Sequence, residues 1–162
     1  MVDPGNEGGR GSVAFLMSQV GAQAAQEFAK ALKPLKLSPC DAGILRLLRR
    51  SPGISQQNLA RALDMHASRL VAVIDALEER GLVVREANPQ DRRLYSLRLT
   101  DAGQEMLGRV GQVARGHNER MCAGLDGEER TQLAALLQKI AVEQGLKAGV
   151  HPGYKDLRPA GK

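Results

Sequence analysis

Aromatic residues are scarce in this sequence, which has two Phe, two Tyr and no Trp among 162 residues. Leu, Val, Ala and Ile must therefore build the core, a composition that suits packed helices. The two cysteines, Cys40 and Cys122, are too few for a disulfide framework or a metal-ligand set. No apolar run is long enough to span a bilayer, and the N-terminus has no signal-peptide core. We expect a soluble, cytoplasmic, single-domain protein without a cofactor or a membrane partner.

Lysine is missing from the whole stretch between Lys36 and Lys139, where every cation is an arginine. Arginine presents a planar fork that matches phosphate and guanine better than an ammonium group does. The formal net charge of +5 permits binding to nucleic acid without requiring it. A GC-rich coding bias would give the same preference for arginine, and both explanations stay open.

Residues 54–100 change from helical to strand periodicity. Apolar residues recur twice at helical spacing, and Gly81 then supplies a stop, since glycine adopts the left-handed conformation without steric cost. Two β-type runs follow, Leu82–Glu86 and Leu94–Leu99, with a polar loop between them. The order helix, turn, helix, β-hairpin predicts a winged helix-turn-helix in a mainly α protein with a small β-hairpin wing.

The loop of the predicted hairpin carries Asp91, Arg92 and Arg93. A rigid hairpin can insert an arginine into the narrow, electronegative minor groove of DNA. The Asp91 carboxylate could hold the Arg93 guanidinium by a charge-assisted hydrogen bond. The alternative is an ordinary surface ion pair of little energetic value. The neighbouring helices favour the DNA-binding interpretation.

Helices with broad apolar stripes flank this unit on both sides. We expect their N-caps, and that of the helix within the unit, at Ser12, Ser38, Ser55, Thr100 and Asp126. The outer stripes are too large for the winged unit to cover, which predicts an isologous homodimer. The predicted organisation is 1–36 as an arm and dimerisation helix, 37–100 as the DNA-binding unit, 101–145 as dimerisation helices, and 146–162 as a tail.

The tail is punctuated by Gly and Pro and is rich in basic side chains. Its composition alone predicts disorder. We expect packing along the other subunit of the dimer to order it.

Four segments resemble the MarR family of transcriptional regulators: LSPCDAGILRLLRRSPGISQQNLARAL, the second-helix segment after it, LEERGLVVREANPQDRRLYSLRLT, and TDAG at Thr100–Gly103. Together they cover residues 37–110. The pattern D-x-R at Asp91–Arg93, followed by L-T at Leu99–Thr100, is highly specific in this context. The resemblance implies a homodimer on pseudopalindromic double-stranded DNA. It also implies repression, often relieved by a small ligand or by thiol oxidation.

The resemblance places two groups of residues on DNA besides the loop of Asp91, Arg92 and Arg93. Backbone phosphate contacts fall on Ser55, Gln56 and Gln57. The groove-facing part of the recognition helix, with its cap, falls on His66, Ala67, Ser68, Arg69, Val71 and Ala72.

Three of these positions depart from the family pattern. His66 stands where an Asp or similar cap is common, and Arg69 stands where a small hydroxyl residue is usual. Ala72 replaces a frequent polar or basic contact. The operator therefore cannot be inferred from relatives. Arg69 could read guanine or clamp a phosphate, whereas Val71 and Ala72 could meet only thymine methyl groups.

Family members often bind phenolic or aromatic acids between the first two helices and the winged unit. At the corresponding place this sequence has Ala42-Gly43 instead of a bulky aromatic residue, which either opens a pocket or lets the helices pack closer. Phe15 and Gln19 could line such a site, and Arg10 could meet a carboxylate. Ordinary core or surface roles are the alternative for each, including Ala42.

Cys40 falls in the first turn of a predicted helix, where the helix dipole favours the oxidisable thiolate. The alternative is a buried cysteine that packs as a small apolar residue. His117, Glu119 and Cys122 do not share one helix face, so we expect no metal site. Helical spacing likewise separates Asp75 from His66 and Ser68, which argues against a catalytic triad.

The sequence thus predicts a DNA-binding transcriptional regulator and not an enzyme. The specific prediction is a homodimeric repressor released by a small aromatic-acid or phenolic effector. The alternatives are an oxidation-sensing repressor that uses Cys40 and a winged-helix protein-interaction module without DNA binding. A winged-helix protein-interaction module would show only weak, non-specific affinity for DNA.

Overall fold

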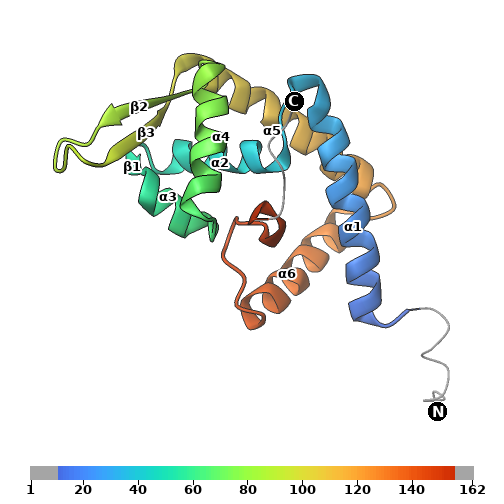
Figure 1. The fold of residues 1–162 in the computed structure, drawn as a ribbon. Helices are drawn as coiled ribbons and strands as arrows, with labels where there is room; N and C mark the ends of the chain where they lie inside the picture. The colour runs from blue at the N-terminus through green and yellow to red at the C-terminus, as the bar shows by residue number, and fades with distance from the viewer. Residues whose placement is uncertain (1–10, 156–162) are drawn as a thin grey trace, which may run out of the picture.

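A computed structural model describes residues 11–155 of the chain, so the prediction for Arg10 and most of the N-terminal arm lie outside it. Helices dominate, and a small sheet projects from one side (Figure 1). The elements in chain order are α1 (Val13–Leu32), η1 (Lys33–Leu35), α2 (Pro39–Arg50), β1 (Ile54–Ser55), α3 (Gln56–Leu63), α4 (Ala67–Glu79), β2 (Val83–Ala87), β3 (Tyr95–Leu99), α5 (Asp101–Met121), α6 (Gly127–Glu143) and η2 (Pro152–Lys155).

Local side-chain caps set where most of the long helices begin, and all five predicted N-caps are confirmed. Each cap oxygen accepts a hydrogen bond from a backbone N–H that would otherwise lack a partner. Ser38 also forms a capping box with Asp41, in which the Ser38 N–H donates to Asp41 at 2.7 Å. The cap residues are Ser12, Ser38, Ser55, Thr100 and Asp126.

The sheet has three antiparallel strands in the order β1-β3-β2. The predicted hairpin is present, but its strands begin one residue later than expected, at Val83 and Tyr95. The short strand β1 was not predicted: Ile54 pairs with Leu97 just before the Ser55 cap of α3. Gly81 has a φ of +69°, which confirms it as the left-handed residue that ends α4.

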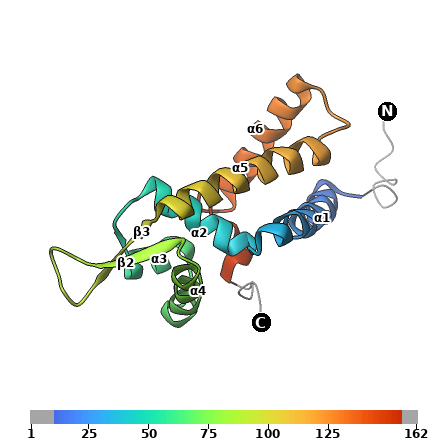
Figure 2. The ribbon, with the colours of Figure 1, turned by 90° about the horizontal axis from the view of Figure 1, so that it is seen from above.

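One apolar core lies beneath the winged unit. Ile44, Leu45, Leu59 and Leu70 are fully buried in it, and Leu97 contributes from the sheet. The long helix α5 connects this unit to α6, so α1, α5 and α6 extend away from the wing (Figure 2). The fold class is therefore the predicted one, mainly helical with a small β wing.

The outer helices present apolar side chains to solvent. On α1, Phe15 is 57% exposed and Val20 is 54% exposed. Helix α6 has no buried residue along its 17-residue length, and Leu136 on it is 51% exposed. A monomer leaves these stripes uncovered, as the sequence pattern led us to expect.

The described part of the tail folds back onto its own subunit, and it makes these contacts without the partner that we expected to order it. Residues 146–155 run from the end of α6 toward α2 and α4 (Figure 1). The Arg46 guanidinium donates to the Gly149 carbonyl at 2.5 Å, and Lys147 donates to the Arg61 carbonyl at 3.0 Å. Tyr154 is 8% exposed. We call residues 146–155 the C-terminal strap.

Candidate nucleic-acid interface

Helix α4 buries one face and exposes the other. Leu70, Val73, Ile74 and Leu77 are buried against the core, at the spacing of an amphipathic helix. The exposed face carries the predicted groove-facing residues Ala67, Ser68, Val71 and Ala72. The His66 N-cap makes no side-chain cap bond, so the imidazole stays free of the helix end.

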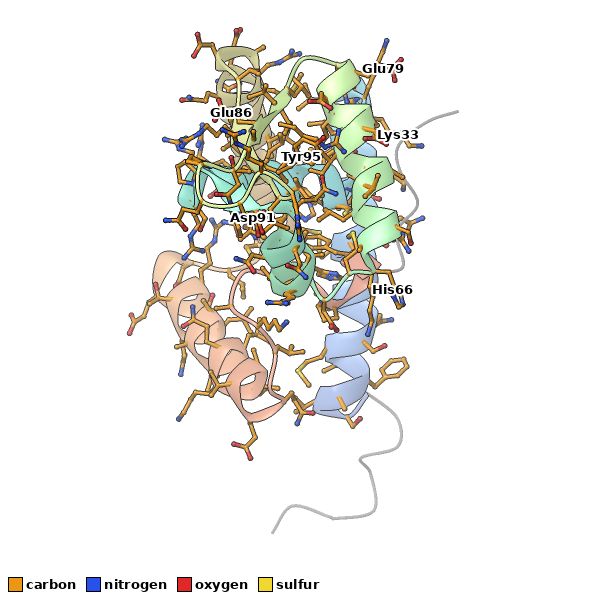
Figure 3. All side chains as sticks on the ribbon, turned by 60° about the vertical axis from the view of Figure 1, so that its left-hand side comes forward. Lys33, His66, Glu79, Glu86, Asp91 and Tyr95 are labelled. Carbon is orange, nitrogen blue, oxygen red and sulfur yellow. The ribbon has the colours of Figure 1, made fainter. Side chains whose placement is uncertain are left out.

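A groove connects α3, the start of α4 and the hairpin. Figure 3 looks toward the hairpin loop, with Asp91 on the loop and α4 running from His66 to Glu79 beside it. Five residues predicted to contact DNA line this groove, and they come from three separate elements or loops. These are Gln56 and Gln57 of α3, His66 and Ala67 at the start of α4, and Arg93 of the loop.

Arg61, Tyr95 and Lys155 also line this groove, and none was predicted to contact DNA. Tyr95 is 55% exposed, although the sequence has only four aromatic residues with which to build its core. Alternation along the strand puts Tyr95 on the same face as Leu97, which favours burial over a DNA contact. Arg61 could have been found from its place four residues, about one turn, after Gln57 on α3.

Ser55 and Arg69 differ from the other predicted contacts. Ser55 is 9% exposed, and its hydroxyl oxygen accepts a bond from the Asn58 N–H at 3.1 Å. Arg69 is half-buried on the flank of α4, where its guanidinium donates to the Lys155 carbonyl. Both remain predicted DNA contacts, but Ser55 also acts as a cap and Arg69 is engaged by the C-terminal strap.

The hairpin loop is held by its own backbone. Asp91 Oδ1 accepts from the Arg93 backbone N–H at 3.0 Å, and Asn88 does the same for Gln90. The expected clamp from Asp91 to the Arg93 guanidinium is therefore corrected to an Asx turn. Arg92 and Arg93 are both exposed. The turn shapes the loop and leaves their charged ends available.

Arg85 of β2 joins the wing to both helices of the motif. Its Nε donates to Gln56 at 3.1 Å, one terminal nitrogen donates to Asp75 at 2.5 Å, and the other pairs with Glu78. The Arg85 side chain is only 15% exposed. Sequence reasoning missed this residue, although its place two residues after buried Val83 puts it on the inward face of the strand.

The residues predicted to bind an effector do not gather in one site. Phe15 and Gln19 are exposed on α1, whereas Ala42 is buried in α2. At Gly43, a β-carbon would lie 2.6 Å from a ring carbon of Tyr154. The space that we expected either to open as a pocket or to close by helix packing is thus filled by the C-terminal strap.

Cys40 is buried, with 2% of its surface exposed. Burial raises its pKa from the ordinary value of 9.0 to about 11, and the neighbouring Asp41 carboxylate adds to the rise. The raised pKa disfavours the thiolate and so does not fit the expectation of a dipole-activated thiol. Cys40 packs as a small apolar residue, which was the alternative.

His117 lies in an apolar contact between α5 and α1. Its ring centroid is 5.3 Å from that of Phe28. Burial lowers the pKa of His117, and nearby Arg120 lowers it further. Within residues 11–155, no three metal-ligating side chains lie close enough together to hold an ion. Nor is any helix in that part of the chain long and apolar enough to cross a bilayer.

The exposed face of α4, the arginine-bearing loop and the groove between them define a winged helix-turn-helix DNA-binding protein. Residues 37–95 match the MarR family profile. The chain belongs to the MarR family of winged-helix transcriptional regulators.

Three relatives illustrate the similarity. A protein named for transcriptional regulation of the hcr operon in Thauera aromatica is 34% identical over 131 residues, which cover 80% of this chain and 79% of that protein. The transcriptional repressor Rv2887 of Mycobacterium tuberculosis is 31% identical over 78% of this chain and 91% of its own length. The repressor CouR, solved on a 23-mer DNA duplex, is 33% identical with a TM-score of 0.72, covering 80% of this chain and 92% of that chain.

Proposed function

We propose that this protein is a homodimeric repressor that binds pseudopalindromic double-stranded DNA and is released by a small aromatic-acid or phenolic effector. The observation that carries the proposal is the groove in which Gln56, Gln57, His66, Ala67 and Arg93 meet. Helix α4 enters the major groove, and Arg93 enters the adjacent minor groove. Repressors among its relatives, one of them DNA-bound, support the same role.

Dimerisation follows from the uncovered helices. The exposed stripes of α1 and α6 need a second surface, and a second copy supplies the same stripes in a self-complementary arrangement. A two-fold dimer separates two recognition helices by about 34–36 Å, the repeat of one DNA turn. The operator is therefore expected to contain two inverted half-sites.

An aromatic effector is consistent with the seat of Tyr154. The space beside Gly43 holds a phenol ring, and Arg46 lies near enough to act on that phenol electrostatically. A free phenolic acid has the same ring and adds a carboxylate. This likeness supports the chemical class of the effector that the family resemblance implies, and not the seat of Tyr154 as the effector's binding site.

Selection of bound duplexes from random DNA tests the central claim. We expect an inverted repeat, and we expect Arg93→Ala to weaken binding to it by about 1–3 kcal/mol. Arg109→Ala is the matched control, since Arg109 is an exposed arginine on α5, outside the groove. Equal affinity of Arg93→Ala and wild type would remove the wing from the mechanism. A panel of aromatic acids added to the complex then tests release.

The dimer is tested by sedimentation of Leu136→Glu, which places a charge on the exposed stripe of α6. We expect monomers and weaker DNA binding. Val84→Glu is the control for the sedimentation measurement, because Val84 is also exposed but belongs to β2, which lies apart from α6 (Figure 1). A Leu136→Glu protein that remained dimeric would place the interface elsewhere.

A further inference from the structure

The C-terminal strap bridges three helices of the DNA-binding unit. It meets α2 through Arg46, the end of α3 through Lys147, and α4 through Arg69. Its first residue is still tied to α6, since the Leu146 N–H donates to the Ala141 carbonyl at 2.9 Å. The strap therefore connects a proposed dimerisation helix directly to the recognition helix.

Tyr154 is the only large apolar anchor in the strap that is buried. It is 8% exposed, and its ring occupies the space that the missing side chain of Gly43 leaves free. Val150 packs at the edge of the same core. Because the other links end on exposed polar groups, seating the Tyr154 ring is what holds the strap closed.

The far end of the strap reaches the DNA-facing groove. Lys155 lines that groove together with His66, Ala67 and Arg93. The Lys155 carbonyl accepts a bond from Arg69, a residue of the first turn of α4. A cation at this place on a recognition helix is within reach of a phosphate only when its guanidinium is free.

Arg69 is incompletely paired in the closed strap. Its Nε is buried and has no hydrogen-bond partner among residues 11–155. A buried guanidinium N–H without an acceptor is unfavourable, whereas a phosphate accepts from an arginine in bidentate fashion. In the closed arrangement, Arg69 therefore keeps an unsatisfied N–H group that a DNA phosphate could accept from.

We propose that the C-terminal strap is an intramolecular brake on DNA binding. When Tyr154 is seated against Gly43, the strap holds Arg69 on the Lys155 carbonyl and withholds that cation from DNA. When Tyr154 leaves its seat, Arg69 is released to a backbone phosphate and binding tightens. The proposal rests on the DNA-binding function proposed above and adds a means of regulating it within the same chain.

Tyr154→Ala tests the brake without changing the net charge. We expect this variant to bind a mixed-sequence duplex of about 30 base pairs roughly three- to tenfold tighter at low salt, with a slope of log affinity on log salt steeper by about 0.9 per subunit. Tyr154→Phe keeps the ring and should match wild type. In an Arg69→Ala background, Tyr154→Ala should give no gain in affinity, because the remaining groove cation that strap opening moves is Lys155, which leaves the groove.

Cys40 provides a measure of strap opening that needs no DNA. It lies one turn before Gly43 on α2 and is buried in the same core as Tyr154. In a Cys122→Ser protein, we expect the Cys40 thiol to react at least tenfold faster with a disulfide reagent when Tyr154 is replaced by Ala, because local opening limits the reaction of a buried thiol.

The two measurements separate the proposals. Faster thiol reaction together with unchanged DNA affinity would overturn the brake and leave the repressor function intact. A gain in affinity that persisted without Arg69 would also overturn it. A protein that bound no duplex even after Tyr154→Ala would overturn both proposals.

Discussion

The ring of Tyr154 lies where residue 43 would carry its β-carbon, 2.6 Å from Cε2 and 2.8 Å from Cζ of that ring. These two residues are far apart in sequence, yet the missing side chain of Gly43 makes room for the ring of Tyr154. Gly43 sits inside α2, where glycine is less favourable than alanine by about 0.5–1 kcal/mol. The gain that offsets this cost is the seat for Tyr154.

Gly43→Ala should therefore displace the strap. A methyl group fits the helix but not the ring, and the ring is the part that can move, because α2 is held by the core. We expect the Cys40 thiol to become reactive in a Cys122→Ser protein. In a Tyr154→Ala background, the same substitution should instead stabilise the protein by about 0.5–1 kcal/mol in a denaturant titration. A Cys40 that stayed protected in Gly43→Ala would show that the ring and the methyl group coexist.

Gly103 is a glycine of a different kind. A β-carbon there would lie 2.0 Å from the Leu82 carbonyl oxygen, and that obstacle is backbone. The strand-helix junction is also fixed by Thr100, whose N–H donates to the same carbonyl at 3.2 Å. Gly103→Ala should destabilise the fold by about 3 kcal/mol, the upper end of overpacking costs.

Gly108→Ala on the same helix is the matched control for Gly103→Ala. It has open space around its β-carbon position, so we expect a small gain from helix propensity. Thermal unfolding of the two α5 variants gives the comparison. Similar melting temperatures for Gly103→Ala and Gly108→Ala would contradict the close approach at Leu82.

The features that were predicted correctly depend on short-range chemistry. Ser38 was predicted as an N-cap because its hydroxyl can bond within one helical turn, and the structure shows this bond to the Asp41 N–H. The spacing of Asp126 and Glu129 predicted a capping box, which the structure confirms at the start of α6. The wing was predicted for a similar reason, since its two main strands are neighbours in sequence.

The features that were missed depend on contacts between distant segments. Strand β1 exists because Ile54 pairs with Leu97, and no local pattern distinguishes it from a helix start. The seat of Tyr154 beside Gly43 joins the tail to the second helix. Burial of Cys40 follows from the packing of several elements, so its effect on the thiol could not be weighed against the helix dipole beforehand.

The network around Arg85 predicts a stiff wing. Arg85 is mostly buried and bonds to Gln56, Asp75 and Glu78, so its loss leaves two carboxylates close together without their cation. We expect Arg85→Gln to reduce the free energy of unfolding by about 2 kcal/mol and to weaken DNA binding, because Arg93 would no longer be held beside α4.

Arg98→Gln is the control for that experiment. Arg98 is also on the wing and pairs with Glu86 at 3.0 Å, but both side chains are about half exposed. Exposed ion pairs contribute roughly 0–1 kcal/mol to the free energy of unfolding. We therefore expect Arg98→Gln to lose little stability and to leave the wing in place. If the two variants lost the same stability, the buried network would be no stronger than a surface pair.

The buried thiol of Cys40 predicts a loss of stability at alkaline pH. Its pKa is about 11 in the folded chain against an ordinary value of 9.0, so the folded state holds the proton more tightly than the unfolded state does. The stabilisation that the protonated Cys40 thiol adds to the free energy of unfolding is complete below about pH 9. It declines as the pH rises toward 11, by up to about 2–3 kcal/mol. Burial also raises the pKa of Tyr154, which acts in the same direction.

Denaturant titrations at neutral and alkaline pH measure this effect. We expect Cys40→Ala to lose about 2 kcal/mol less than wild type between pH 8 and pH 11, with Tyr154→Phe removing the phenol contribution separately. Cys122→Ala controls for the loss of a thiol as such. A Cys40→Ala protein as sensitive to alkali as wild type would mean that the folded protein leaves this thiol with its ordinary acidity, which would restore Cys40 as a candidate for oxidation.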